Sequence, residues 1–184
     1  MRRGLRVHPD GGRGPVIRIE VEMLRPRAHQ LQLTYEVAAE IGALRIPDAA
    51  TPARADGLWR RTCFEAFLRT GDGEGYCEFN FSPSGQWAAY GFDGYRAGMS
   101  VLDMPAAPSI VVSQTQAGLS LQARLDLAAL PGLPAKRPWR LGVSAVIEDS
   151  GGTIAYWALA HAPGKPDFHH PDGFACEVPA PEDA

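Results

Sequence analysis

Long hydrophobic runs are missing from this sequence and lysine is scarce, and each absence excludes a class of function. No run of about 18 apolar residues occurs, so no segment is predicted to span a membrane. Lys136 and Lys165 are the only lysines among 184 residues, and the formal net charge is -3. The arginines before Arg27 are not interleaved with aromatic residues, so we expect no nucleic-acid partner.

Cysteine is also rare. Cys63, Cys77 and Cys176 are an odd number without C-x-x-C spacing, which argues against a disulfide framework and against a thiolate zinc site. The basic start, Met1-Arg2-Arg3, is followed by a polar, glycine-rich stretch rather than by an apolar segment. The sequence therefore predicts reduced thiols, no export signal and a cytoplasmic location.

No long amphipathic helix is visible, whereas 20 glycines and 16 prolines separate many short strand-like segments. Apolar and polar residues alternate over residues 17–23 and 30–37. Hairpins are predicted for residues 109–116 with 119–125, about Ala117-Gly118, and for 140–148 with 154–161. About nine strands in all predict an all-β, two-sheet antiparallel β-sandwich of the jelly-roll or immunoglobulin-like kind. We expect a flexible N-terminal segment over residues 1–14, one domain over 15–178 and an acidic tail over 179–184.

The most informative stretch is a predicted hairpin of residues 62–69 with residues 76–82. Antiparallel pairing of Phe67 with Glu78 also pairs Glu65 with Asn80, so these four side chains share one face. The opposite face is then wholly apolar and must pack on the second sheet. A slip of one residue would mix the two sets, so the pattern favours this register.

Two interpretations of the polar face remain open at this level. Residue types alone favour a solvated outer surface. The alternative is a ligand groove, in which Phe67 and Tyr90 provide apolar platforms beside carboxylates and an amide. The place of Trp87 depends on the loop over residues 82–85. A four-residue loop puts Trp87 beside Asn80, and a one-residue bulge turns it to the other face.

Catalysis and metal binding are both weaker alternatives. Glu65 and Glu78 could act as an acid/base pair on a glycoside, but no positioned nucleophile or tuned acid is visible, so no catalytic residue is predicted. Residues 156–170 concentrate three of the five histidines. Weak metal-ligand candidates in this stretch are His161, Asp167, His169 and His170. In the other interpretation, Lys165 and His169 line the mouth of the groove and Trp157 forms a second aromatic wall.

Three stretches carry a resemblance to a known family. Residues 58–67, 76–87 and 156–169 resemble the bacterial stand-alone DOMON-like proteins, which are related to carbohydrate-binding module family nine. The resemblance runs from about Ile17 to Val178 and implies a β-sandwich that binds a ligand rather than catalysing a reaction. It moves the balance for the polar face toward a groove. It also implies that Glu65 and Asn80 make polar ligand contacts and that Trp59 and Trp157 are stacking aromatics.

The sequence thus predicts a non-enzymatic, DOMON-like domain that binds a carbohydrate or a similar polyhydroxylated small molecule and needs no cofactor. The predicted ligand contacts, with the edge of the site last, are Glu65, Glu78, Asn80, Trp87, Trp59, Arg96, Trp157 and Lys165. One alternative is a domain that binds haem or a metal, for which Met99, Met104, His161 and Lys165 are the available axial ligands. Another is a protein-interaction module that uses an exposed sheet edge. No oligomeric state is predicted.

Overall fold

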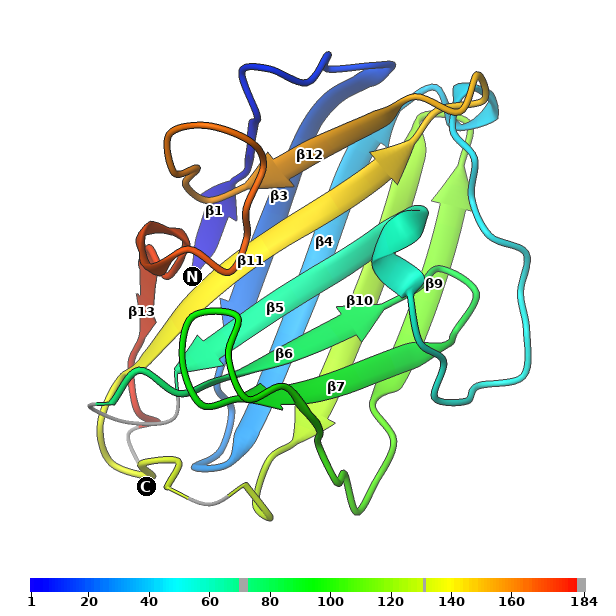
Figure 1. The fold of residues 1–184 in the computed structure, drawn as a ribbon. Helices are drawn as coiled ribbons and strands as arrows, with labels where there is room; N and C mark the ends of the chain where they lie inside the picture. Colours follow the sequence, from blue (N-terminus) through cyan, green and yellow to red (C-terminus); the bar gives the residue numbers. More distant parts are fainter. Residues whose placement is uncertain (70–72, 131, 182–184) are drawn as a thin grey trace.

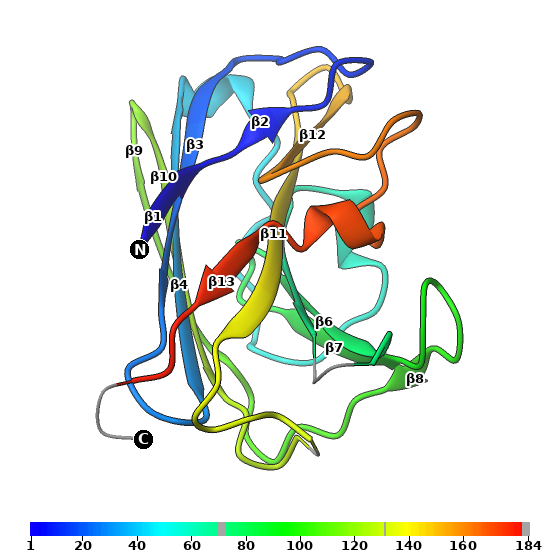
Figure 2. The ribbon, with the colours of Figure 1, turned by 90° about the vertical axis from the view of Figure 1, so that its left-hand side faces the viewer.

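A computed structural model of the chain describes residues 1–69, 73–130 and 132–181. Two antiparallel sheets are stacked face to face in a β-sandwich, as Figure 1 shows from the front and Figure 2 from the side. Within the described residues there are 13 strands and three short 3-10 helices. No helix in this part of the chain is long and apolar enough to cross a membrane.

Sheet A contains five strands in the order β1-β3-β4-β10-β9. Their bounds are β1 Arg2–Gly4, β3 Val16–Leu24, β4 Gln30–Ala39, β10 Gly118–Asp126 and β9 Ser109–Thr115. Buried and more exposed residues alternate along β4 and β10, because each strand turns one face to the partner sheet and one to solvent. Leu33, Tyr35 and Leu121 are among the fully buried residues on the inner face.

Sheet B contains eight strands, seven of them in the order β2-β12-β11-β5-β6-β7-β8, and β13 pairs with the remaining part of β11. Their bounds are β2 Arg6–Val7, β12 Ile154–Ala158, β11 Trp139–Glu148, β5 Cys63–Arg69, β6 Tyr76–Phe81, β7 Trp87–Phe92, β8 Ser100–Val101 and β13 Cys176–Val178. Every residue of β6 is buried, and so is all of β5 except Arg69. Both faces of this sheet are therefore covered.

The main core fills the space between the two sheets. From sheet B it receives Phe64, Phe79 and Phe81, and from sheet A it receives Tyr35, whose hydroxyl donates a 2.7 Å hydrogen bond to the backbone oxygen of Glu65. A second, smaller cluster lies on the outer face of sheet B. It consists of Phe67, Tyr76, Ala88, Tyr90, Phe92 and Phe174.

The register predicted for the central hairpin is confirmed. Phe67 pairs with Glu78 and Glu65 pairs with Asn80 between β5 and β6. Part of the turn predicted between these strands, residues 70–72, lies outside the described residues. The two other predicted hairpins form as β9 with β10 and as β11 with β12. The all-β sandwich is likewise confirmed, with 13 described strands instead of about nine, because short edge strands carry too few residues to show alternation.

The N-terminal residues, expected to be a flexible segment, instead join both sheets. Strand β1 pairs with β3 in sheet A, and β2 pairs with β12 in sheet B (Figure 2). The prediction of a solvated segment rested on its charge and glycine content. Backbone hydrogen bonds at a sheet edge do not require apolar side chains, so composition alone missed these strands.

Candidate functional site

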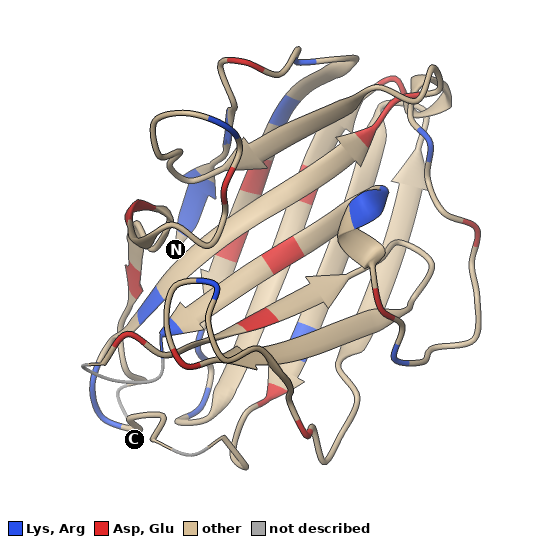
Figure 3. Ribbon diagram, in the orientation of Figure 1, with Lys and Arg blue, Asp and Glu red and all other residues tan. Residues whose placement is uncertain are grey.

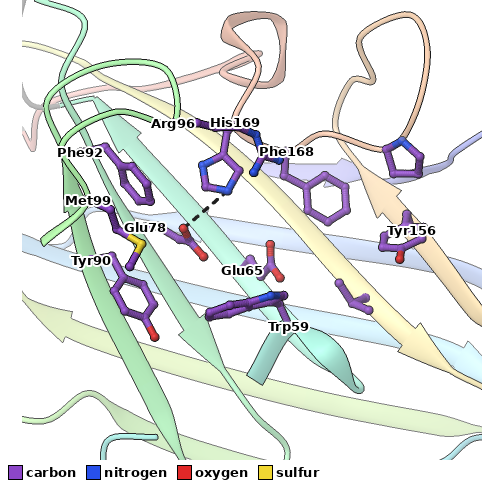
Figure 4. Close-up of a pocket in the computed structure, with 12 residues that line it drawn as sticks. Trp59, Glu65, Glu78, Tyr90, Phe92, Arg96, Met99, Tyr156, Phe168 and His169 are labelled. Atoms are coloured by element: carbon purple, nitrogen blue, oxygen red, sulfur yellow. Dashed lines mark ion pairs between the residues drawn. The ribbon is translucent and has the colours of Figure 1, made fainter. Parts of the chain in front are cut away.

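A cavity of about 420 Å³ lies on the outer face of sheet B, on the side away from sheet A (Figure 4). Strands β5, β6 and β11 supply its floor through Glu65, Glu78 and Val146. Three segments rise around this floor. They are the 3-10 helix η2 (Leu58–Arg60), the loop from β7 to β8, and the loop between β12 and η3 (Pro171–Gly173).

Two buried carboxylates form the polar part of the floor. Acidic positions on the neighbouring strands β5 and β6 are visible in the middle of sheet B in Figure 3. Glu65 is 3% exposed and Glu78 is 6% exposed. The Ser144 hydroxyl donates a 3.3 Å hydrogen bond to Glu65 Oε2, and Asn80 Nδ2 donates a 2.8 Å bond to Glu78 Oε1. Both carboxylates keep further acceptor capacity toward the cavity.

This environment disfavours ionisation of the two groups. Burial raises the pKa of the Glu65 carboxyl well above its usual range, and the nearby charge of Glu78 raises it further. Burial also raises the pKa of Glu78, although the hydrogen bond from Asn80 and the charge of Arg96 act in the opposite direction. Among the described residues, no Lys or Arg forms an ion pair with either carboxylate.

His169 stands at the edge of the cavity above Glu78. Its Nε2 lies 3.8 Å from Glu78 Oε2 (Figure 4). Its Nδ1 lies 2.8 Å from the Tyr76 hydroxyl oxygen. Burial and the charge of Arg96 lower the pKa of His169 to about 4. The ring is therefore neutral at pH 7, and it adds a hydrogen-bonding group to the cavity without adding positive charge.

Asp167 ties two of the cavity loops together. It accepts hydrogen bonds from the Tyr95 hydroxyl, from Arg96 Nη2 at 2.8 Å and from the His169 backbone at 3.0 Å. Burial opposes ionisation, yet the bonds from Tyr95 and Arg96 lower the pKa of Asp167. Arg96 adopts a left-handed φ of 52°, which is unfavourable for a side chain with a Cβ atom and points to a backbone shaped for this contact.

Aromatic side chains form the walls. Trp59 is 38% exposed and meets the Tyr90 ring edge-to-face at 6.0 Å. Tyr156 and Phe168 meet edge-to-face on the opposite side, with their ring centroids 6.1 Å apart. Figure 4 shows these rings arranged around the two carboxylates, with Met99 and Phe92 beside Tyr90. Such walls offer flat apolar surfaces next to fixed acceptors.

The covering loops are held down by the second aromatic cluster. Tyr76 stacks on Phe92 at 4.7 Å, and Phe67 meets His169 at 5.2 Å. Gly142 of β11 lets η3 approach the sheet, because a Cβ atom at this position would lie 2.8 Å from the Gly173 carbonyl oxygen. The outer face of sheet B is therefore a packed layer with a cavity in it, and the interpretation of this face as a solvated surface is wrong.

Of the eight predicted contacts, the structure brings four to the cavity: Glu65, Glu78, Trp59 and Arg96. The other four lie elsewhere. Asn80 is completely buried on the same face of the sheet, where it donates a hydrogen bond to Glu78 and does not line the cavity. Lys165 is exposed on the covering loop, whose next residue, Pro166, lines the cavity.

The predicted placement of Trp87 and Trp157 is corrected. Trp87 pairs with Phe81 rather than with Asn80, so it points into the main core and is 7% exposed. The loop between β6 and β7 spans residues 82–86, one residue more than the four-residue loop considered above. The Ser82 backbone N–H donates to the Gln86 carbonyl oxygen across this loop. Trp157 pairs with Ala145 and is also in the core. Its neighbour Tyr156 forms the cavity wall, because successive side chains of a strand point to opposite faces.

The weak metal candidates are not gathered into one site. His161 bonds the Arg6 backbone oxygen at 2.8 Å, whereas Asp167 and His169 belong to the loop contacts described above. His170 bonds the backbone of Asp172. In the described part of the chain, no three His, Cys, Asp or Glu residues are grouped so that they could hold a metal ion. Of the axial haem candidates, Met99 lines the cavity, while His161 and Lys165 do not.

Sequence reasoning missed several lining residues: Phe92, Met99, Val146, Tyr156, Pro166 and Phe168. The alternation of β12 could have revealed Tyr156, since placing Trp157 in the core puts its neighbour outside. The loop residues had no such signal, because their position depends on long-range contacts such as that between Asp167 and Arg96.

Comparisons with known proteins identify the fold. No family model and no curated protein sequence matches this chain. A crystal structure of a putative carbohydrate-binding protein from Bacteroides uniformis is similar with a TM-score of 0.67 at 12% identity, over 94% of this chain and 83% of that chain.

A family 9 carbohydrate-binding module from Caldicellulosiruptor kristjanssonii in complex with glucose gives a TM-score of 0.61 at 10% identity, over 98% of this chain and 84% of that one. A module of the same family and organism in complex with cellotriose gives 0.56 at 11%, over 89% and 74%. At these identities the likeness establishes the fold alone. The chain is a β-sandwich of the kind seen in family 9 carbohydrate-binding modules.

Proposed function

We propose that this protein is a non-enzymatic binding domain and that its ligand is a sugar held in the cavity on sheet B. One observation carries the proposal: two buried carboxylates, Glu65 and Glu78, face a cavity walled by Trp59, Tyr90 and other aromatic rings. A sugar ring has an apolar C–H face, which stacks on an aromatic ring, and hydroxyl groups, which need fixed acceptors and donors.

The energetics of the floor support a ligand. Burying a carboxylate without enough hydrogen bonds costs about 1–3 kcal/mol or more, so such groups persist where something else compensates. Hydroxyl groups of a bound sugar would donate hydrogen bonds to Glu65 and Glu78. Arg96 and His169, at the rim of the cavity, would form hydrogen bonds with other hydroxyl groups of the sugar. The cavity volume of about 420 Å³ falls within the usual range for small-molecule sites.

The comparisons support the same ligand class. Two of the structures that share this fold are complexes with glucose and with cellotriose. Binding is proposed over hydrolysis because glycoside hydrolysis needs one carboxylate that stays ionised beside a protonated acid, whereas burial raises the pKa of both Glu65 and Glu78.

Isothermal titration calorimetry with glucose, cellobiose and cellotriose tests the proposal. We expect saturable binding by the wild-type protein, and at least tenfold weaker binding by Glu65→Gln, which keeps the shape of the side chain but removes the carboxylate. Glu40→Gln is the matched control, because Glu40 is exposed and directly follows β4 of sheet A, and it does not line the cavity. Absence of binding to these sugars and to a broad glycan array would contradict the proposed function.

Hydrolysis is tested separately with chromogenic glycosides between pH 4 and 8. Inert substrates agree with a binding domain. Release of the chromophore that Glu65→Gln abolishes would contradict the non-enzymatic part of the proposal.

A further inference from the structure

The charges around the cavity do not balance, and this imbalance bears on the kind of sugar that would bind. Glu65 and Glu78 contribute two carboxylates at the floor. Arg96 is the one cationic side chain among the described lining residues, and its guanidinium is already paired with Asp167 at 2.8 Å. His169 is neutral at pH 7. When ionised, the floor therefore carries up to two negative charges without a cationic partner of their own.

Other titratable groups around the floor do not supply the missing charge. The titratable groups that interact electrostatically with Glu65 are Glu78, Cys63 of its own strand and Tyr35, whose hydroxyl approaches the Glu65 backbone from the main core. Glu78 faces Tyr76, Tyr90, His169 and Arg96. All of these except Arg96 are neutral or acidic at pH 7, and burial raises the pKa of all three phenols. A positive charge would thus have to come from the ligand.

The walls would also favour a cation. The faces and edges of Trp59, Tyr90 and Phe168 surround the carboxylates, and aromatic rings attract an ammonium group through their negative faces. An aromatic enclosure with carboxylates at its base combines the two features that recognise organic cations. A hydroxyl group in the same position would gain neither the ion pair nor the cation–π attraction.

Resting on sugar binding as the function of this cavity, we propose that the preferred ligand is an amino sugar, whose ammonium group lies against Glu65 and Glu78. The apolar ring face would stack on the aromatic walls, and hydroxyl groups of the sugar would bond to Arg96 and His169 at the rim. This narrows the ligand class from sugars in general to sugars that carry a free amine.

Release of protons from Glu65 and Glu78 on binding would be a second sign of an amino-sugar ligand. The carboxyl pKa values of Glu65 and Glu78 are raised by burial in the empty site, so these groups keep their protons to a higher pH than free carboxyl groups do. A bound ammonium favours the ionised form, so binding should release protons, and affinity should increase with pH as long as the amine stays charged. A neutral sugar brings no charge to favour ionisation of these carboxyl groups, so its binding should release fewer protons.

The experiment is calorimetric titration at pH 6 with glucosamine, glucose and N-acetylglucosamine, each in two buffers with different protonation enthalpies. An amine of ordinary pKa is charged at this pH. We expect glucosamine to bind at least tenfold more tightly than the two neutral sugars, with proton release. Galactosamine and galactose form a second matched pair in case the site selects another ring configuration.

Variants separate the charge effect from a change in the fold. Glu65→Gln should reduce the preference for the amine to within about threefold, while Glu40→Gln should keep it. Equal or weaker binding of the amino sugars by the wild-type protein would overturn the amino-sugar inference and leave sugar binding intact. Failure of every sugar, including cellotriose, would instead overturn the proposed function itself.

Discussion

Sheets A and B are built from similar strands, yet they differ in what covers their outer faces. In β4 and β10 of sheet A, buried residues alternate with half-exposed ones, so the outer face is open to solvent. In β5, β6 and β11 of sheet B, the outer face is buried as well. The cover consists of η2, the β7–β8 loop and the loop that contains Asp167.

This difference shows where the fold leaves room for function. Sheet A contributes its inner face to the core, and its outer face is in contact with solvent. Sheet B supports the core with one face and holds a second layer on the other. The polar residues Glu65 and Glu78 lie inside that second layer, where hydrophobic packing would favour apolar residues. Four predictions test how separate these roles are, from the largest expected effect to the smallest.

The inner face of sheet B should carry stability. Phe79 of β6 is fully buried in the main core, so Phe79→Ala should lower the free energy of unfolding by about 3–5 kcal/mol. Urea unfolding followed by tryptophan fluorescence measures this change. A loss below about 1 kcal/mol would mean that the core between the sheets is loosely packed.

The outer layer of sheet B should be sensitive to acid. The pKa of His169 is lowered to about 4, so the unfolded chain binds a proton there that the folded chain refuses between about pH 6.5 and pH 4. Stability from this group is full above pH 6.5 and is lost as the pH falls, by about 2–3 kcal/mol at pH 4. Unfolding curves at several pH values should be flatter for His169→Asn. Parallel curves for the variant and the wild type would contradict this role.

The walls of the cavity should matter for binding more than for folding. Trp59 is 38% exposed, so Trp59→Ala should change the free energy of unfolding by less than about 1 kcal/mol. Loss of its ring should weaken sugar binding at least tenfold, which is about 1.4 kcal/mol. Ile17→Ala is the matched control, because Ile17 is 67% exposed on sheet A. Equal sugar affinity of the Trp59 variant and this control would remove Trp59 from the site.

The outer face of sheet A should tolerate change. Arg124 is exposed on β10 opposite Gln32 of β4. Arg124→Ala should therefore alter the free energy of unfolding by no more than about 0.5 kcal/mol and leave sugar binding unchanged. A cost above 1 kcal/mol in urea unfolding would show that this face is also packed, and the contrast between the sheets would fail.

Much of sheet B could be predicted from local pattern. Strands β5 and β6 each place apolar residues on one face and Glu65, Glu78 and Asn80 on the other, so a single register satisfies both. That register is present in the structure. The two carboxylates of the cavity floor lie in one hairpin, which is why Glu65 and Glu78 could be named before their surroundings were known.

Loop geometry accounts for what local pattern could not predict. One additional residue between β6 and β7 reverses the orientation of Trp87, because side chains alternate with every residue. Trp157 was expected at the cavity wall, but the alternation of β12 puts it in the core and turns its neighbour Tyr156 to the cavity. An aromatic residue suits the core as well as a binding site, so its type does not distinguish the two.

The sequence by itself determined an all-β chain, the register of its central hairpin and a pair of carboxylates on one face of that hairpin. Alternating residue types are sufficient for these features, since period two decides which face each side chain takes. Only the tertiary structure decided that this face is enclosed. Asp167 contacts Tyr95 and Arg96, which lie 72 and 71 residues before it in the sequence, and these contacts join two loops. Such contacts convert a polar strip into a cavity with buried charge, and no local pattern encodes them.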